Sequence, residues 1–165
     1  MSGAGDDEKR QQQKVWDAAE AVGSSLLVTI GEEGPHARPM SAIIRAEDGL
    51  IWFMSDEESG KLDEIRADPR ASVVLSDAKS THVVFAGKAS VSSERALIEA
   101  LWSPAAEAFY PAAPMDPEIR LIRFRPDTGE LWESPGRVVS LFRMVAAVAT
   151  GTSARSIGSH IKAPL

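Results

Sequence analysis

A short part of this chain combines the residue types that could hold a phosphate beside a flat apolar surface. Arg38 offers a planar fork of N–H donors that can grip two phosphate oxygens, and Lys61 adds a point charge. The serines nearby add hydroxyls, and the glycine before the lysine allows close backbone approach at an expected helix start, where free amides favour an anion. The candidate cofactor-binding residues are Arg38, Pro39, Met40, Trp52, Phe53, Met54, Ser55, Ser59, Gly60 and Lys61.

The apolar members of this set have a second interpretation. Alternation along a strand places Trp52 and Met54 on one face and Phe53 on the other, so at least one of them is expected in the core or at a subunit interface. Trp102 and Trp132 suit burial as well as stacking on a cofactor ring. Arg38 or Lys61 alone would be interpreted as a surface residue. Because both belong to one short series of strands and turns that leads into a helix, an anion site is favoured.

Other polar residues are interpreted more simply. His36 and His82 are expected to be satisfied or exposed strand histidines. Glu57 and Glu58 are interpreted as solvent-facing charge near a helix start. The pair 63–64 lies on a helix with its members pointing apart, so it is not an acid/base dyad. No catalytic acid or base is singled out.

The composition is that of an ordinary soluble domain. The 165 residues are 44% hydrophobic and 25% charged, which fits one domain with a sizeable core. The net charge of -6 argues against nucleic acid as the main partner. There is no cysteine, and three widely spaced histidines predict no metal site. Neither a secretory signal nor a bilayer-spanning run is recognised, so cytoplasmic residence without a membrane partner is the default expectation.

Hydrophobic periodicity predicts a single domain over residues 7–150, between a disordered segment 1–6 and a flexible tail 151–165. The domain opens with an amphipathic helix over 7–22. An antiparallel meander then follows, with strands over 25–30, 36–45 and 50–55. A helix over 59–67, with Leu62 and Ile65 inward, ends at Asp68-Pro69.

The second half of the domain continues the same pattern. Strands are expected over 71–76 and 81–91, and Gly87 predicts a bulge or sharp bend in the second. A helix over 93–102, capped by Ser92 or Ser93, precedes an irregular segment over 104–115. A strand over 119–125, a turn over 126–129, a last strand over 130–133 and an amphipathic helix over 137–149 complete the domain.

Six or seven antiparallel strands with short inserted helices favour a mainly β architecture with added helices (α+β). Their regular spacing favours a closed or split antiparallel barrel over a doubly wound sheet. There is no βαβ alternation and no Gly-rich dinucleotide fingerprint, so a nucleotide-binding α/β fold is not expected.

An ordered series of motifs carries a resemblance to a known family. The motifs occupy residues 37–40, 52–56, 59–61, 65–70, 84–91, 101–104, 110–111 and 131–135. Their order and intervals resemble the flavin-binding split-barrel superfamily of pyridoxamine 5'-phosphate oxidase, and the later ones its general stress protein branch. The resemblance covers about residues 10–150.

The resemblance implies a homodimer with two FMN sites at the subunit interface, with FAD as the alternative cofactor. Arg38 and Lys61 match the positions that bind the ribityl phosphate, and Ser55 and Ser59 match the accompanying hydroxyls. The backbone of 52–55 would lie along the isoalloxazine edge. Trp132 is the first candidate for the aromatic residue that the partner chain supplies, ahead of Trp102.

The chain also departs from true pyridoxamine 5'-phosphate oxidases. Gly60 stands where they carry a second basic residue, and 134–138 lacks their C-terminal substrate-phosphate segment. The first expectation is therefore an FMN-dependent oxidoreductase, linked to stress response, that acts on an unidentified small molecule. A flavin-binding or flavin-sequestering stress protein without turnover, a deazaflavin-dependent reductase and a ligand-free structural dimer are the alternatives.

Overall fold

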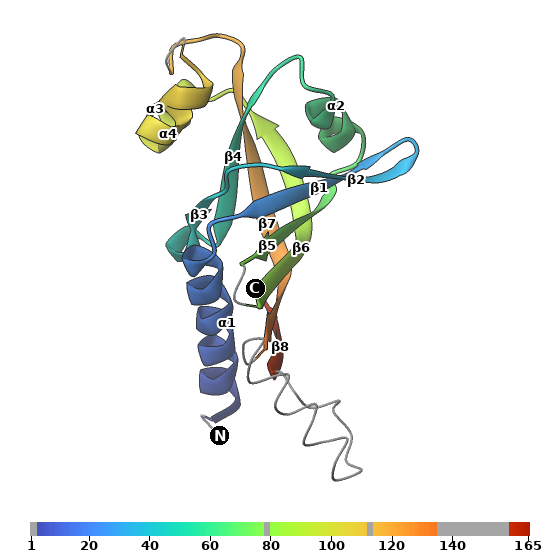
Figure 1. The fold of residues 1–165 in the computed structure, drawn as a ribbon, viewed down its shortest axis with the longest axis vertical. Helices are drawn as coiled ribbons and strands as arrows, with labels where there is room; N and C mark the ends of the chain where they lie inside the picture. Colours follow the sequence, from blue (N-terminus) through green and yellow to red (C-terminus); the bar gives the residue numbers. More distant parts are fainter. Residues whose placement is uncertain (1–2, 78–79, 112–113, 135–158) are drawn as a thin grey trace.

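The computed structural model describes residues 3–77, 80–111, 114–134 and 159–165. This part of the chain forms one antiparallel sheet with helices around it (Figure 1). Its strands are β1 (Ser25–Gly31), β2 (Gly34–Pro39), β3 (Ile43–Arg45), β4 (Leu50–Asp56), β5 (Arg70–Ser76), β6 (Thr81–Ser92), β7 (Ile119–Glu133) and β8 (Ser159–Pro164). Its helices are α1 (Gly3–Ala21), the 3-10 helix η1 (Ala46–Asp48), α2 (Gly60–Ala67), α3 (Arg95–Leu101) and α4 (Pro104–Phe109).

The strand order is β2-β1-β5-β6-β7-β4-β3, with β8 on β7, and every pair is antiparallel. The two end strands, β2 and β3, are not paired with each other in the described residues, so the sheet stays open. This architecture confirms the mainly β, split-barrel prediction.

The predicted meander is wrong, because the expected strand over 36–45 divides into β2 and β3. Pro39 ends β2, and a proline cannot donate a hydrogen bond to a continuing ladder. After this break, β3 pairs with β4, and β4 joins β7 rather than β2. Because of this break, β2 lies at one end of the strand order and β3 lies at the other end.

A second correction concerns β7, which runs without a break from 119 to 133 although 126–129 has a turn-like sequence. Gly87 pairs with Pro126, and the register between β6 and β7 shifts between Ala86 and Gly87. The bulge predicted at Gly87 is therefore confirmed. Strand prolines are tolerated at bulges because no ladder donor is required there, which explains how Pro126 stays within the strand.

The predicted helix boundaries also change. Helix α1 begins at Gly3, so most of the segment expected to be disordered is helical, with Asp6 in the first turn where negative charge is favoured. Helix α3 begins at Arg95, and its N-cap is Glu94 without a side-chain capping bond, rather than Ser92 or Ser93.

Two further segments differ from the predictions. The segment expected to be irregular contains α4, because Ser103 accepts a hydrogen bond from the Ala106 amide and Pro104 stands in the first turn. The predicted flexible tail contains β8, whose Ala163 is fully buried. The helix predicted over 137–149 lies outside the described residues.

The sheet has an apolar cluster on each face. Helices α1 and α2 contribute to one cluster, and α3 packs on the other. The first is centred on Phe53, Phe85, Phe124, Val15 and Leu62. The second contains Trp52, Met54, Ile98, Leu101, Ile119 and Leu121. None of the described helices combines the length and the apolarity needed to cross a membrane.

Candidate functional site

Arg38 of β2 and Lys61 of α2, the two predicted phosphate-binding cations, are close in space. Arg38 Nη2 lies 2.8 Å from Oε2 of Glu64, which follows Lys61 by three residues on α2. Burial lowers the pKa of Lys61, and the charge of Arg38 lowers it further, against the opposite influence of Asp56 and Glu64. Two cations therefore share one flank of α2.

The start of α2 offers donors rather than acceptors. Lys61 Nζ donates a hydrogen bond to Ser59 Oγ, and no carboxylate in the described residues forms an ion pair with Lys61. Ser59 is the N-cap residue but makes no capping bond with its side chain. The amides of Gly60 and Lys61 have no backbone acceptor within the described part of the chain. Nothing lies within 4 Å of the position that a Cβ on Gly60 would take, so there is open space beside this residue.

Glu64 is the residue of this region that the sequence interpretation missed. Its carboxylate accepts hydrogen bonds from the Thr29 hydroxyl and from Arg38, and its Oε1 lies 2.7 Å from His36 Nδ1. Burial alone would raise the pKa of Glu64, but these bonds outweigh it and lower the pKa to about 2. Asp63 is exposed and pairs with Arg66, so the pair 63–64 does point apart as predicted.

The sequence held a partial signal for this cluster. His36 and Arg38 are two residues apart on β2 and therefore project from one face of the strand. Thr29 pairs with His36 in the ladder between β1 and β2. The role of Glu64 depends on the packing of α2 over this face of β2. Local spacing in the sequence does not predict that packing.

The depressed pKa of Glu64 predicts a loss of stability confined to acid. The fold favours the ionised carboxylate, so its contribution is complete above the ordinary pKa of 4.5 and is lost as the pH falls toward about 2. We expect the wild type to lose about 2 kcal/mol more than Glu64→Gln between these limits, a value reduced for solvent screening. Urea unfolding at several pH values measures this difference. The exposed Glu20→Gln variant is the control, and equal acid dependence of wild type and Glu64→Gln would contradict the prediction.

The side chains of the predicted ring-edge strand belong to the core. Phe53 is fully buried on one face of β4, and Trp52 and Met54 are buried on the other, as alternation predicted. Ser55 is also fully buried, and its hydroxyl donates to the Asp56 carbonyl at 3.2 Å. A ligand beside this segment would therefore meet mainly backbone.

The backbone of β4 has one side that is only partly paired. Strand β7 pairs with β4 along 51–56, whereas β3 pairs with it along 50–52. Beyond β3, the Tyr110 hydroxyl donates to the Met54 carbonyl at 3.0 Å, and burial raises the pKa of Tyr110. At the end of β2, Pro39 is exposed, and Met40 is half-buried and packs against the core.

Trp132 is not brought to Arg38 and Lys61 within one copy of the chain. It lies on β7 opposite His160 of β8, and the two rings stack with centroids 4.7 Å apart. Figure 1 places β8 and α2 toward opposite ends of the molecule. Trp102 packs against the second apolar cluster. A role for Trp132 at the predicted phosphate-binding cations therefore requires a second copy.

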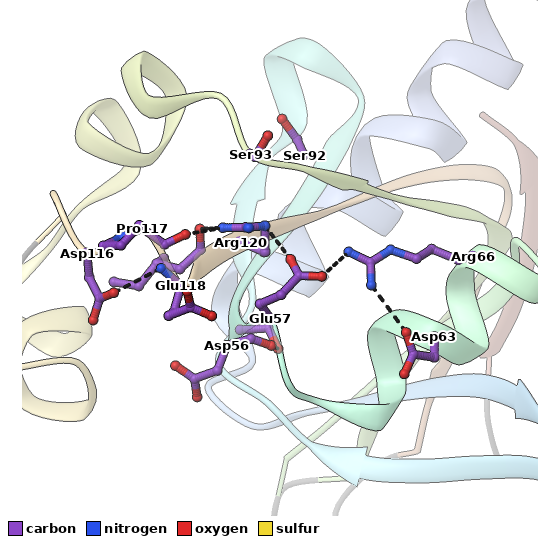
Figure 2. Close-up of polar contacts among 12 residues, drawn as sticks. Asp56, Glu57, Asp63, Arg66, Ser92, Ser93, Asp116, Pro117, Glu118 and Arg120 are labelled. Carbon is purple, nitrogen blue, oxygen red and sulfur yellow. Dashed lines mark hydrogen bonds and ion pairs between the residues drawn. The ribbon is translucent and has the colours of Figure 1, made fainter.

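A second charged cluster lies on the other flank of α2 and centres on Glu57 (Figure 2). Glu57 Oε1 is 2.5 Å from Arg66 Nη2, and Glu57 Oε2 is paired with Arg120 Nε. The hydrogen bond from Arg66, followed by the charges of Arg120 and Arg66, lowers the pKa of Glu57 against the effect of burial. The interpretation of Glu57 as merely solvent-facing charge is therefore wrong, because it joins α2 to β7.

Comparison with known proteins gives a consistent result. The model of a family described as pyridoxamine 5'-phosphate oxidase like matches residues 10–155. General stress protein 26 of Bacillus subtilis (strain 168) is 27% identical over 121 residues, which cover 70% of this chain and 84% of that protein.

Two crystal structures are similar in fold. A protein from Jannaschia sp. CCS1 that carries the general stress protein 26 name is 24% identical, with a TM-score of 0.72 over 96% of this chain and 99% of that chain. A general stress FMN/FAD binding protein from Xanthomonas citri is 27% identical, with a TM-score of 0.66 over 76% of this chain and 89% of that chain.

Proposed function

The chain belongs to the pyridoxamine 5'-phosphate oxidase like family, and from this premise we propose that it is a flavoprotein that binds FMN. The phosphate of the cofactor binds Arg38 and Lys61 at the start of α2. The protein then serves as an oxidoreductase, linked to stress response, for a small molecule.

The observation that carries this proposal is the Lys61 ammonium. It is partly buried beside a second cation, without a carboxylate of its own in the described residues. Burial and the neighbouring cation both disfavour the charged ammonium, and a bound anion would offset them. The Gly60 and Lys61 amides and the Ser59 hydroxyl add neutral donors, which suits a phosphate monoester. The donor set therefore fits the phosphate of FMN.

Glu64 sets the charge at this site. It offsets the charge of Arg38, so the free protein does not hold two bare cations there, while Lys61 has no ion-pair partner in the described residues. Because Glu64 engages Nη2 of Arg38, the other guanidinium nitrogens are the ones left for the phosphate.

Bound FMN supplies hydride or single-electron transfer through its isoalloxazine ring. The chain itself holds the phosphate and offers the backbone of β4 between Phe53 and Ser55 to the ring edge. Tyr110 holds the Met54 carbonyl and so restricts which backbone groups a ligand meets. We propose that two copies form a homodimer and that Trp132 of the second copy closes the site.

Reconstitution tests the proposal. We expect apo-protein to bind FMN and to shift and sharpen its visible absorption bands. FAD, whose second phosphate has no cation assigned among these residues, is expected to bind less tightly. Anaerobic addition of NADH or NADPH should then bleach the bound flavin. A protein that leaves the spectra of both flavins unchanged would refute flavin binding.

A flavin-binding stress protein without turnover is the second candidate. One observation favours it: the side chains described at this site, Arg38, Lys61 and Ser59, are suited to holding an anion, and none of them is assigned to a substrate. Bound flavin that neither nicotinamide donor bleaches would favour this candidate. The deazaflavin alternative is less favoured, since a larger and more negatively charged cofactor would require more cations than Arg38 and Lys61.

A further inference from the structure

A pocket of about 380 Å³ lies beside the Glu57 cluster, between α2, β6 and β7. Its floor is apolar and comes from Ile65, Pro69, Ala89 and Val91. The floor is held in place because the Ala89 amide donates to the Pro69 carbonyl at 2.7 Å. A small organic molecule could bury apolar surface against this floor.

The rim of the pocket is polar and contains Arg66, Arg120 and Ser93, whereas the side chain of Ser90 alternates to the other face of β6 from Ala89 and Val91. Figure 2 shows the two arginines on either side of Glu57, with Ser93, which directly follows β6, above Arg120. In the described part of the chain, the side-chain hydroxyl of Ser93 has no hydrogen-bond partner. The rim therefore has a hydroxyl group that a ligand can use.

The guanidinium groups of Arg66 and Arg120 are fixed by hydrogen bonds that use only some of their donor nitrogens. Arg120 bonds Glu57 through Nε and the carbonyls of Pro117 and Ile119 through Nη1. Arg66 bonds Asp63 and Glu57 through its two terminal nitrogens. Among the described residues, Nη2 of Arg120 and Nε of Arg66 have no acceptor. Side chains held in this way lose little entropy when they bind a ligand.

The unused donors select the kind of ligand. Glu57 and Asp63 together offset the charges of the two arginines, so recognition rests on Nε of Arg66 and Nη2 of Arg120 and not on a net charge of the rim. We propose that this pocket binds a monoanionic carboxylate with a small apolar body, such as an aromatic or branched aliphatic acid. The carboxylate would accept hydrogen bonds from the arginines and from Ser93, and the body would lie on the apolar floor.

This site is distinct from the one proposed for FMN. Lys61 and Glu64 lie on one flank of α2, and Arg66 lies on the other, with the buried Leu62 and Ile65 between them. The proposal therefore does not depend on flavin binding. A phosphate dianion is less suited to this pocket, because Glu57 already engages both arginines and the floor offers a phosphate no donors.

Isothermal titration of the full-length protein, as purified, with benzoate and with cyclohexanecarboxylate tests the proposal. We expect a dissociation constant of about 1 mM or tighter for at least one acid. Arg66→Gln should weaken binding about tenfold or more through loss of one charge-assisted contact. Ser93→Glu, which leaves the arginine pairs intact and adds a negative charge at an exposed rim position, should abolish binding. Arg125→Gln, the same type of change at an exposed position on β7, should bind as wild type does.

Thermal unfolding of each variant separates lost binding from lost folding, and the exposed Ser93 variant remains decisive if Arg66→Gln is destabilised. Failure of both acids to bind, or equal binding by wild type and both rim variants, would overturn the proposal. Binding of inorganic phosphate in place of either acid would overturn the ligand class. FMN titration of the same variants should give wild-type affinity, so failure of the carboxylate site is distinguishable from failure of the flavin proposal.

Discussion

Arg38→Ala is expected to weaken FMN binding by about 2 to 3 kcal/mol, and Lys61→Ala by about 1 to 2 kcal/mol. Arg38→Ala has the larger effect because it removes a donor and also leaves the Glu64 carboxylate without its cation, close to the incoming phosphate. Lys61→Ala removes a cation whose described partner is the Ser59 hydroxyl. Fluorescence titration of FMN, whose emission changes on binding, measures both losses.

A double variant separates the two parts of the Arg38 effect. Glu64→Gln in the Arg38→Ala background should recover part of the lost affinity, because it removes the uncompensated negative charge. Lys88→Ala and Arg125→Ala change cations that are exposed on β6 and β7, and both are expected to leave affinity unchanged. If Arg38→Ala and Lys61→Ala both bind FMN as wild type does, the phosphate binds elsewhere.

Gly87→Ala is expected to cause a large loss of stability at the bulge between β6 and β7. A Cβ at this position would lie 2.1 Å from the Arg125 carbonyl oxygen and 2.7 Å from Pro126 Cα, both of them backbone atoms. Because neither atom can move without disturbing the pairing of β6 with β7, we expect a loss of about 3 kcal/mol in the free energy of unfolding. Urea denaturation at neutral pH measures it.

Gly23→Ala is the matched control. Nothing lies within 4 Å of the position of its Cβ, and its φ is outside the left-handed region. We therefore expect it to be neutral or to stabilise the protein by about 0.5 kcal/mol, since alanine restricts the unfolded chain. Equal stability of Gly87→Ala and Gly23→Ala would show that the strands around the bulge can move apart at little cost.

Local spacing was sufficient for several features of this protein. Leu62 and Ile65 recur at helical intervals and are buried on α2, and the alternation at 52–54 correctly separated Phe53 from its neighbours. Both signals follow from the backbone period of a single element, which nearby residues set by themselves. The same is true of Gly87, since a glycine within a strand marks a bulge or close backbone approach.

Pairing between residues distant in the sequence determined features of the fold and of the charged clusters that local spacing did not predict. The segment 126–129 has the residues of a turn, yet it stays in β7 because Pro126 lies opposite the bulge in β6. Sequence alone identified Arg38 and Lys61 as a candidate pair of cations. Only the tertiary structure placed Glu64 on Arg38 and Glu57 between Arg66 and Arg120, because the contacts of Glu64 with Arg38 and of Glu57 with Arg120 join elements distant in the chain. Charge pairing of this kind depends on which faces the fold packs together, and no local pattern carries that information.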